Sequence, residues 1–164
     1  EHPNRTNRAS PLIKRFRILD ENGGTSGQVA MGTRVLFETH FTLAEATAGL
    51  ALSLQIFNWM GQRVTTLHTG YQANMPPRLS GDIVASCGVP QLDLMPGQYH
   101  IIAALSSSQR YTLDRIDPVA SFEILPSDVF ETGRLPQSQD GVIICRGAWL
   151  FRSASAPLVR SLHQ

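Results

Sequence analysis

The chain has 164 residues, of which 42% are hydrophobic and 16% charged, so it suits one globular domain with a substantial core. Its 14 basic and 13 acidic residues leave a formal net charge of +1, which gives no electrostatic reason to expect a nucleic-acid partner. The longest uncharged stretch, residues 46–62, contains Gln55, Asn58 and a turn signal, which excludes it as a membrane span.

The N-terminal residues are polar and lack periodicity, so residues 1–10 are predicted to be a linker tail. From Lys14 to Leu19 basic and apolar side chains alternate, a pattern typical of an edge strand that is protected by charge. The next five residues, Asp20 to Gly24, are a cluster of turn formers. We therefore expect the folded domain to begin at residue 11.

Two segments in the first half of the chain have the alternation of half-buried strands. Residues 34–42 place Val35, Phe37 and Phe41 on one face. In residues 50–58 the leucines and Ile56 point inward, whereas Gln55 and Phe57 point outward. The alanines of residues 45–52 also fit a helix, but the alternation favours a strand.

The second half of the chain predicts further strands separated by turn formers. They cover residues 64–69, 81–86, 98–105, 121–125 and 141–144. Pro96-Gly97 is a turn signal, because proline presets one turn dihedral and glycine accepts positive φ. Between two of these strands, Tyr111 and Arg115 are interpreted as a structural corner, whose hydroxyl and guanidinium groups satisfy loop carbonyls.

Roughly seven to nine short strands without a long helix predict an all-β fold, an antiparallel β-sandwich of the immunoglobulin-like or jelly-roll type. The sandwich is expected to span residues 11–149, and residues 150–164 are expected to form a C-terminal tail. The residues predicted to be buried between the sheets are Phe37, Leu52, Leu54, Ile101, Phe122 and Ile124.

The sequence lacks the motifs of several enzyme classes. The only lysine, Lys14, has no glycine-rich turn before it, so a P-loop for ATP is excluded. No Gly-x-Ser-x-Gly elbow occurs, and no spacing pairs two carboxylates for glycoside hydrolysis. Without a Cys-x-x-Cys motif or clustered histidines, no metal or other cofactor is expected. We expect a protein that is not an enzyme.

The two cysteines, Cys87 and Cys145, allow two interpretations. Their separation is near that of an immunoglobulin-type bridge between sheets, which would indicate an oxidising compartment. No tryptophan lies between them, and both fall in the second half of the chain. Two free, buried thiols are therefore favoured over a disulfide.

One set of polar and aromatic residues fits sugar recognition. A sugar site needs flat rings for pyranose faces and planar polar groups for hydroxyls, mounted on a rigid sheet. The candidate residues are Gln55, Phe57, Trp59, Arg63, His68, Tyr71 and His100. Six of them also have a structural alternative. Phe57 could cover the sheet or lie in a subunit contact, and Trp59 could be a cap packed on its own turn. The two histidines could be satisfied surface or core residues, and Gln55 and Arg63 could be plain solvated positions.

Several motifs, taken in order, resemble a known family. They are the turn cluster at residues 20–24, Asn58-Trp59-Met60-Gly61-Gln62-Arg63, the strand start Pro96-Gly97-Gln98-Tyr99, residues 111–116, and Phe122-Glu123-Ile124. The set is similar to the C-terminal domain of Wzt, the nucleotide-binding component of ABC transporters that export bacterial O-antigen polysaccharide. The likeness extends from about Ile13 to Trp149.

The resemblance implies a non-catalytic sandwich domain that binds an O-antigen-type polysaccharide. It also implies a homodimer in which residues 141–149 are exchanged between the two protomers. A link to the transporter's membrane subunit, through an ATPase domain earlier in the polypeptide, is implied as well. The location would be cytoplasmic, at the inner face of the bacterial inner membrane. The chain begins at Glu1 without a methionine, as an excised domain would. The alternatives are an accessory module of a secreted glycosidase and a structural immunoglobulin-like interaction domain.

Overall fold

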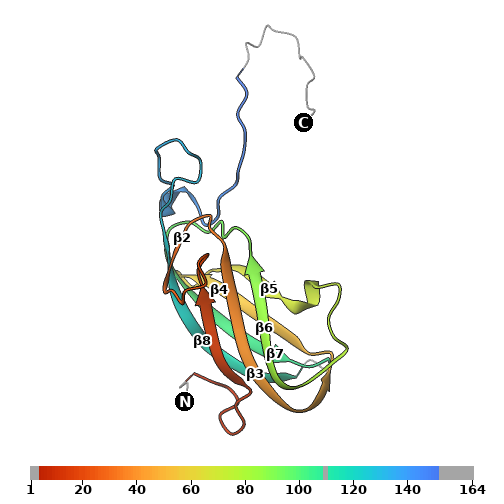
Figure 1. The fold of residues 1–164 in the computed structure, drawn as a ribbon. Coiled ribbons are helices and arrows are strands. Elements are labelled where there is room, and N and C mark those ends of the chain that lie inside the picture. The colour runs from red at the N-terminus through yellow and green to blue at the C-terminus, as the bar shows by residue number, and fades with distance from the viewer. Residues whose placement is uncertain (1–3, 109–110, 152–164) are drawn as a thin grey trace.

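The computed structural model describes residues 4–108 and 111–151, and its regular elements are almost all strands (Figure 1). The strands are β1 (Ile13–Leu19), β2 (Gln28–Ala30), β3 (Val35–Ala48), β4 (Ala51–Asn58), β5 (Arg63–His68), β6 (Arg78–Val89), β7 (Gly97–Ser106) and β8 (Thr112–Leu125). Two short 3-10 turns accompany them, η1 (Thr69–Tyr71) and η2 (Ser138–Asp140). The predicted all-β class is confirmed.

The strands form two sheets that pack face to face (Figure 1). One sheet has three strands in the order β1-β3-β6, and the other has five in the order β2-β8-β7-β4-β5. Every pairing is antiparallel except that of β2 with β8, which is parallel. The fold is thus the predicted β-sandwich, with β2 as a strand that the sequence pattern did not indicate.

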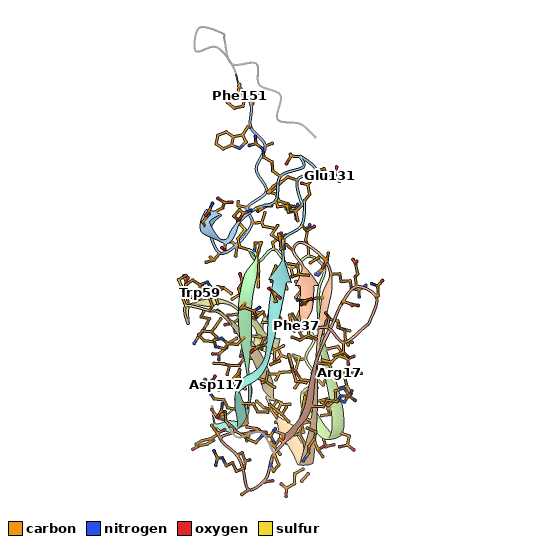
Figure 2. All side chains as sticks on the ribbon, turned by 90° about the vertical axis from the view of Figure 1, so that its left-hand side faces the viewer. Arg17, Phe37, Trp59, Asp117, Glu131 and Phe151 are labelled. Atoms are coloured by element: carbon orange, nitrogen blue, oxygen red, sulfur yellow. The ribbon has the colours of Figure 1, made fainter. Side chains whose placement is uncertain are left out.

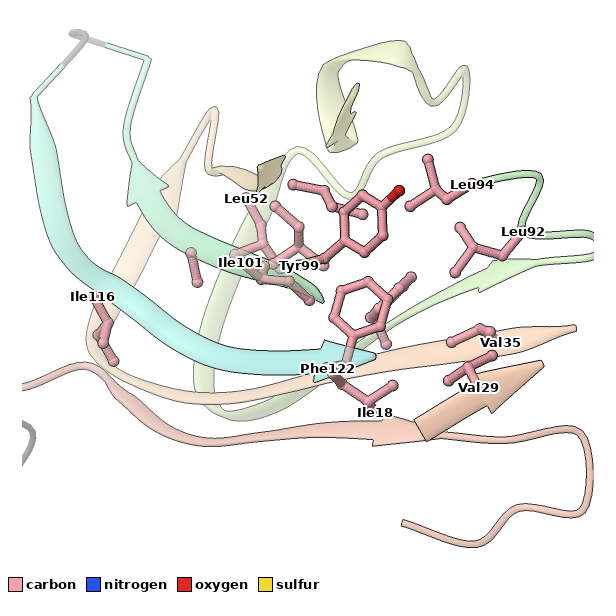
Figure 3. Close-up of a cluster of buried hydrophobic side chains, with 14 of the residues drawn as sticks. Ile18, Val29, Val35, Leu52, Leu92, Leu94, Tyr99, Ile101, Ile116 and Phe122 are labelled. Carbon is pink, nitrogen blue, oxygen red and sulfur yellow. The ribbon is translucent and has the colours of Figure 1, made fainter. Parts of the chain in front are cut away.

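The core lies between the two sheets and is built mainly from alternate residues of the strands (Figure 3). The Phe37 ring meets the Phe122 ring edge-on at 6.3 Å, and Tyr99 stacks on Phe122 at 5.6 Å. The Tyr99 hydroxyl donates a 2.7 Å hydrogen bond to the Met95 carbonyl, so its polar end is satisfied. All six residues predicted to be buried lie in this core.

The direction of the β4 side chains was also predicted correctly. Leu52, Leu54 and Ile56 are buried, and the residues between them are only half-buried. The strand therefore has one face in the core and one at the surface, as alternation requires. This places Gln55 and Phe57 on the outer face of the five-stranded sheet.

The predicted corner at residues 111–116 is wrong, because β8 begins at Thr112 and runs as one long strand. Its pairing with β7 contains a bulge: Ala120 faces Ile101 and Ile116 faces Ala103, so residues 117–119 lie opposite Ile102 alone. Tyr111 is exposed, and the Arg115 guanidinium donates to the Asp117 carboxylate at 2.8 Å instead of to loop carbonyls. Because the bulge interrupts the alternation of side chains, the sequence pattern did not predict the first half of β8.

The N-terminal residues predicted as a linker tail contact the sandwich from Asn4 onward. Arg5 pairs with Ile116 in an antiparallel bridge, and the Thr6 amide donates to the Arg115 carbonyl at 3.0 Å. These contacts use backbone groups, so the polar composition of the segment does not oppose them.

The predicted strand at residues 141–144 is reduced to a single bridge between Leu94 and Ile143. Two backbone hydrogen bonds flank that bridge, from Met95 to Val142 and from Ile144 to Asp93, and Ile144 is buried. Beyond this point the chain extends away from the sandwich (Figures 1 and 2). Its last described side chains, Trp149, Leu150 and Phe151, are each 88% exposed. Most of the predicted C-terminal tail, residues 152–164, lies outside the described residues.

Candidate ligand-binding face

Three of the predicted site residues form a stack across the outer face of the five-stranded sheet. Phe57 on β4 lies opposite His100 on β7 and opposite Arg63 on β5. The Phe57 and His100 rings are nearly parallel, with centroids 5.2 Å apart and an interplanar angle of 8°. The Arg63 guanidinium carbon lies 5.4 Å from the Phe57 centroid, within the range of a cation–π contact.

This stack changes what Phe57 can offer to a ligand. Because β5 and β7 flank β4, the guanidinium and the imidazole lie on opposite sides of the Phe57 ring. The ring presents its edge to solvent, and its two faces are occupied. The expectation that Phe57 would cover a pyranose face is therefore not met by this geometry. The stack instead holds two planar hydrogen-bonding groups in fixed positions.

Next to the stack, the outer face is formed by shorter side chains. Gln55 lies between Thr66 on β5 and Ile102 on β7. One step further along β4, Ser53 lies between His68 and Ala104. Serine and alanine leave the sheet backbone closer to solvent than the stack does. The face is therefore raised at Phe57 and lower toward Ser53.

His68 and Tyr71 stand together at the end of β5. Their rings lie 5.6 Å apart and are tilted by 55°. The Nδ1 atom of His68 accepts a 2.8 Å hydrogen bond from the Gly70 amide. In the neutral ring the proton is therefore on Nε2, which is left to donate to a ligand. Tyr71 itself is 85% exposed.

Trp59 stands at the tip of the β4–β5 hairpin, at the opposite end of β5. It is 73% exposed and lies at the periphery of the sandwich (Figure 2). The turn is held by the buried Asn58, whose Oδ1 accepts from the Met60 and Gln62 amides at 3.1 and 2.9 Å. Gly61 has a φ of 76°, the left-handed conformation that this turn requires. Asn58, and not Trp59, therefore caps the hairpin.

A groove of about 470 Å³ opens between the sheets and is lined by residues of β5 and β6, an edge strand of each. Its floor is apolar, with Leu52, Leu54 and Ile83, and its rim includes His68 and Gln72. The sequence did not indicate this groove, since the half-exposed alternation of β6 resembles that of any surface strand. Cys87 also lines the groove, and burial raises the pKa of its thiol.

The charged groups near the outer face are largely paired. Arg115 pairs with Asp117 at 2.8 Å, and Gln28 donates to Glu123 at 2.8 Å.

Among residues 4–108 and 111–151, no three His, Cys, Asp or Glu side chains gather in a way that could hold a metal ion. The thiols of Cys87, on β6, and Cys145, in the C-terminal segment, are both free. The prediction that both would be buried is wrong, because Cys87 is only partly buried and Cys145 is exposed on a segment beyond the last strand. The described residues include no helix long and apolar enough to cross a membrane.

The two packed sheets place the chain in the class of small all-β sandwich domains. The family model of the Wzt C-terminal domain matches residues 4–135, and the chain belongs to this family. A crystal structure of the C-terminal domain of Wzt has the same fold, with a TM-score of 0.71 at 13% sequence identity. That match covers 92% of this chain and 90% of the other. No curated protein matches the chain.

Proposed function

We propose that the chain is a non-catalytic carbohydrate-binding domain that recognises an O-antigen-type polysaccharide for export by an ABC transporter. Membership of the Wzt C-terminal domain family supports the class of function. The observation that carries the site is the stack of Arg63, Phe57 and His100 on an outer sheet face. It fixes a guanidinium and an imidazole beside the amide of Gln55, groups that suit sugar hydroxyls.

The dimensions of the face suit an oligosaccharide better than a single sugar. Trp59 and Tyr71 are exposed rings at the two ends of β5, which has six residues. A strand of that length spans roughly 20 Å. We infer that a glycan lies along β5 and β4, with its apolar faces on Trp59 and Tyr71. Its hydroxyls would meet Arg63, Gln55 and His68 between them.

The family also supports the proposed partners and location. The domain would reach the membrane subunit of the transporter through an ATPase domain of the same polypeptide. It would act at the cytoplasmic face of the bacterial inner membrane. Export of a bound glycan then needs recognition without chemistry, which agrees with a site built from hydrogen-bonding and aromatic groups.

We further infer that the chain forms a homodimer through the C-terminal segment predicted at residues 141–149. Residues 142–144 contact residues 93–95 of the same chain, and Arg146 pairs with Asp93, so the part left for a partner begins after Arg146. Trp149 and Phe151 stack on each other at 6.5 Å and are exposed. The groove between β5 and β6 offers an apolar surface and two unpaired strand edges that could receive this segment.

A glycan array tests the function. The intact chain should bind polysaccharide from the bacterium that makes it, and Gln55→Ala should weaken that binding. Arg15→Ala is the control, since Arg15 is exposed on β1 of the other sheet and lies outside the groove. An array that stays silent, including for the producer's own polysaccharide, would favour a structural interaction domain. Binding only to glycans outside bacterial O-antigens would favour an accessory module of a glycosidase.

A further inference from the structure

The outer edge of β8 is shared by two short segments from the N-terminal part of the chain. β2 covers the C-terminal end of β8, where Gln28 to Ala30 pair with Glu123 to Leu125. Residues 4–7 cover the N-terminal half. There the Asp117 amide donates to the Asn4 carbonyl at 3.2 Å, and the Asn7 side chain donates to the Leu113 carbonyl at 3.0 Å. The β8 bulge at residues 117–119 lies between the two segments.

The bulge also borders the ligand-binding face. It lies opposite Ile102, whose neighbour on the other side is Gln55. Ile102 has outward parity and is not part of the cluster that fills the core, yet it is only 5% exposed. Outer-face groups must therefore cover it, and residues 117–119 are the segment of β8 that lies opposite it. Residues 117–119 thus form a wall of the face next to Gln55.

Residues 4–7 are fixed to the sandwich by a buried carboxylate. Asp114 is fully buried, and its Oδ2 accepts from the Leu12 and Ile13 amides at 2.9 Å each. Its Oδ1 lies 3.7 Å from Nε of Arg5, and the Arg5 guanidinium also donates to the Ile13 carbonyl. One carboxylate therefore ties the start of β1 and residue 5 to β8. Asn4 is held against Asp117 by this arrangement.

We propose that residues 4–7 are a positioning element of the ligand-binding face. They hold the bulge in the shape that covers Ile102 and flanks Gln55. The effect on glycan binding rests on the proposed function, whereas the effect on the shape of the bulge rests on the backbone contacts alone. Loss of the contacts of residues 4–7 should therefore change glycan affinity through the bulge.

The test removes one backbone hydrogen bond from this segment. Thr6→Pro eliminates the amide that donates to the Arg115 carbonyl, and Thr6→Ala keeps the amide and is the matched control. Two readouts need no ligand: hydrogen exchange of the Asp117 amide and the methyl resonance of Ile102. We expect Thr6→Pro to speed that exchange about tenfold, as for loss of one or two hydrogen bonds. We also expect it to shift the Ile102 methyl and to weaken binding of the producer's surface polysaccharide several-fold.

The proposal is overturned if Thr6→Pro and Thr6→Ala give the same Asp117 exchange and the same Ile102 resonance. It is also overturned if both ligand-free signals change while polysaccharide affinity does not. If Thr6→Pro does not fold, a chain that begins at Arg5 lacks the Asn4 carbonyl that accepts from the Asp117 amide, and it should show the same changes at Asp117 and Ile102. If the unaltered chain binds no polysaccharide, the proposed function fails, and the ligand-free signals still decide whether residues 4–7 hold the bulge.

Discussion

The imidazole of His100 lies almost parallel to the ring of Phe57, with centroids 5.2 Å apart, although 43 positions separate the two residues along the chain. The contact arises because β4 and β7 are adjacent and antiparallel, in a register that places the two residues opposite each other. Arg63 joins from the other side of Phe57. The stack ties three strands together at one end of the outer face.

Replacing Phe57 with alanine should weaken glycan binding about tenfold while leaving the melting temperature nearly unchanged. The ring is half-buried on the outer face, so its loss leaves no cavity in the core. The substitution also frees the Arg63 and His100 side chains, which must then lose conformational freedom when the glycan binds. Isothermal titration calorimetry and thermal unfolding measure the two effects. A drop of many degrees in melting temperature would mean that Phe57 supports the fold.

Truncating Leu54 to alanine should have the opposite profile. Leu54 is 3% exposed and points between the sheets, so the change should cost roughly 2–5 kcal/mol of unfolding free energy. Its direct effect on the outer face should be small, because Leu54 faces away from it. Chemical denaturation measures the loss. A cost near zero would contradict the assigned direction of β4.

The two β4 residues also show how far sequence reasoning reaches. Alternation along residues 50–58 is enough to separate the core face from the outer face, and it placed Gln55 and Phe57 correctly. Parity does not reveal which residues meet across strands. The stack depends on register, which is set by pairing between distant segments. The sequence therefore predicted the members of the face but not the covered faces of the Phe57 ring.

Two other features escaped prediction for different physical reasons. Residues 4–7 pair with β8 through backbone groups and an arginine, so they carry none of the hydrophobic alternation that marks a strand. The first half of β8 contains Asp114, Arg115 and Asp117, and its bulge shifts the alternation. Charged residues in a strand suggest a loop until a buried partner is known. Here Asp114 has that partner in Arg5 and the amides of β1.

Asp114→Asn should therefore be among the most destabilising single changes, at roughly 3–5 kcal/mol, the range for breaking a buried ionic contact. The amide nitrogen of asparagine would either face the Leu12 and Ile13 amides or point toward Arg5, and both arrangements leave donors opposed. Urea unfolding measures the effect. Asp82→Asn is the control, because Asp82 is exposed and bonds only to the Thr42 hydroxyl. If both variants lost the same unfolding free energy, the contacts of Asp114 would not be what stabilises this part of the fold.

The loop at residues 128–133 should lose order in acid. Hydrogen bonds from the Gly133 and Thr132 amides hold the pKa of Asp128 below its ordinary value of 3.8. Because the pKa is lower in the folded loop, the carboxylate stabilises it above pH 3.8, and this contribution is lost as pH falls through the folded pKa. The Gly133 amide resonance should titrate with a midpoint below 3.8. In Asp128→Asn the same resonance should not titrate, and a midpoint at or above 3.8 would contradict the contact.

The last prediction is that the dimer depends on residues beyond Arg146. Arg146 donates to the Val129 carbonyl at 2.9 Å and pairs with Asp93 at 3.0 Å, so the chain is fastened to its own sandwich up to that point. A chain that ends at Arg146 keeps these contacts and the buried Ile144, and loses Trp149 and Phe151. Light scattering should give a dimer for the intact chain and a folded monomer for the shortened one. Three exposed apolar residues in a row favour association, since burying each large side chain contributes roughly 1.5–3 kcal/mol. An intact chain that remains monomeric at high micromolar concentration would rule out the dimer, and a shortened chain that still dimerises would place the interface on another surface.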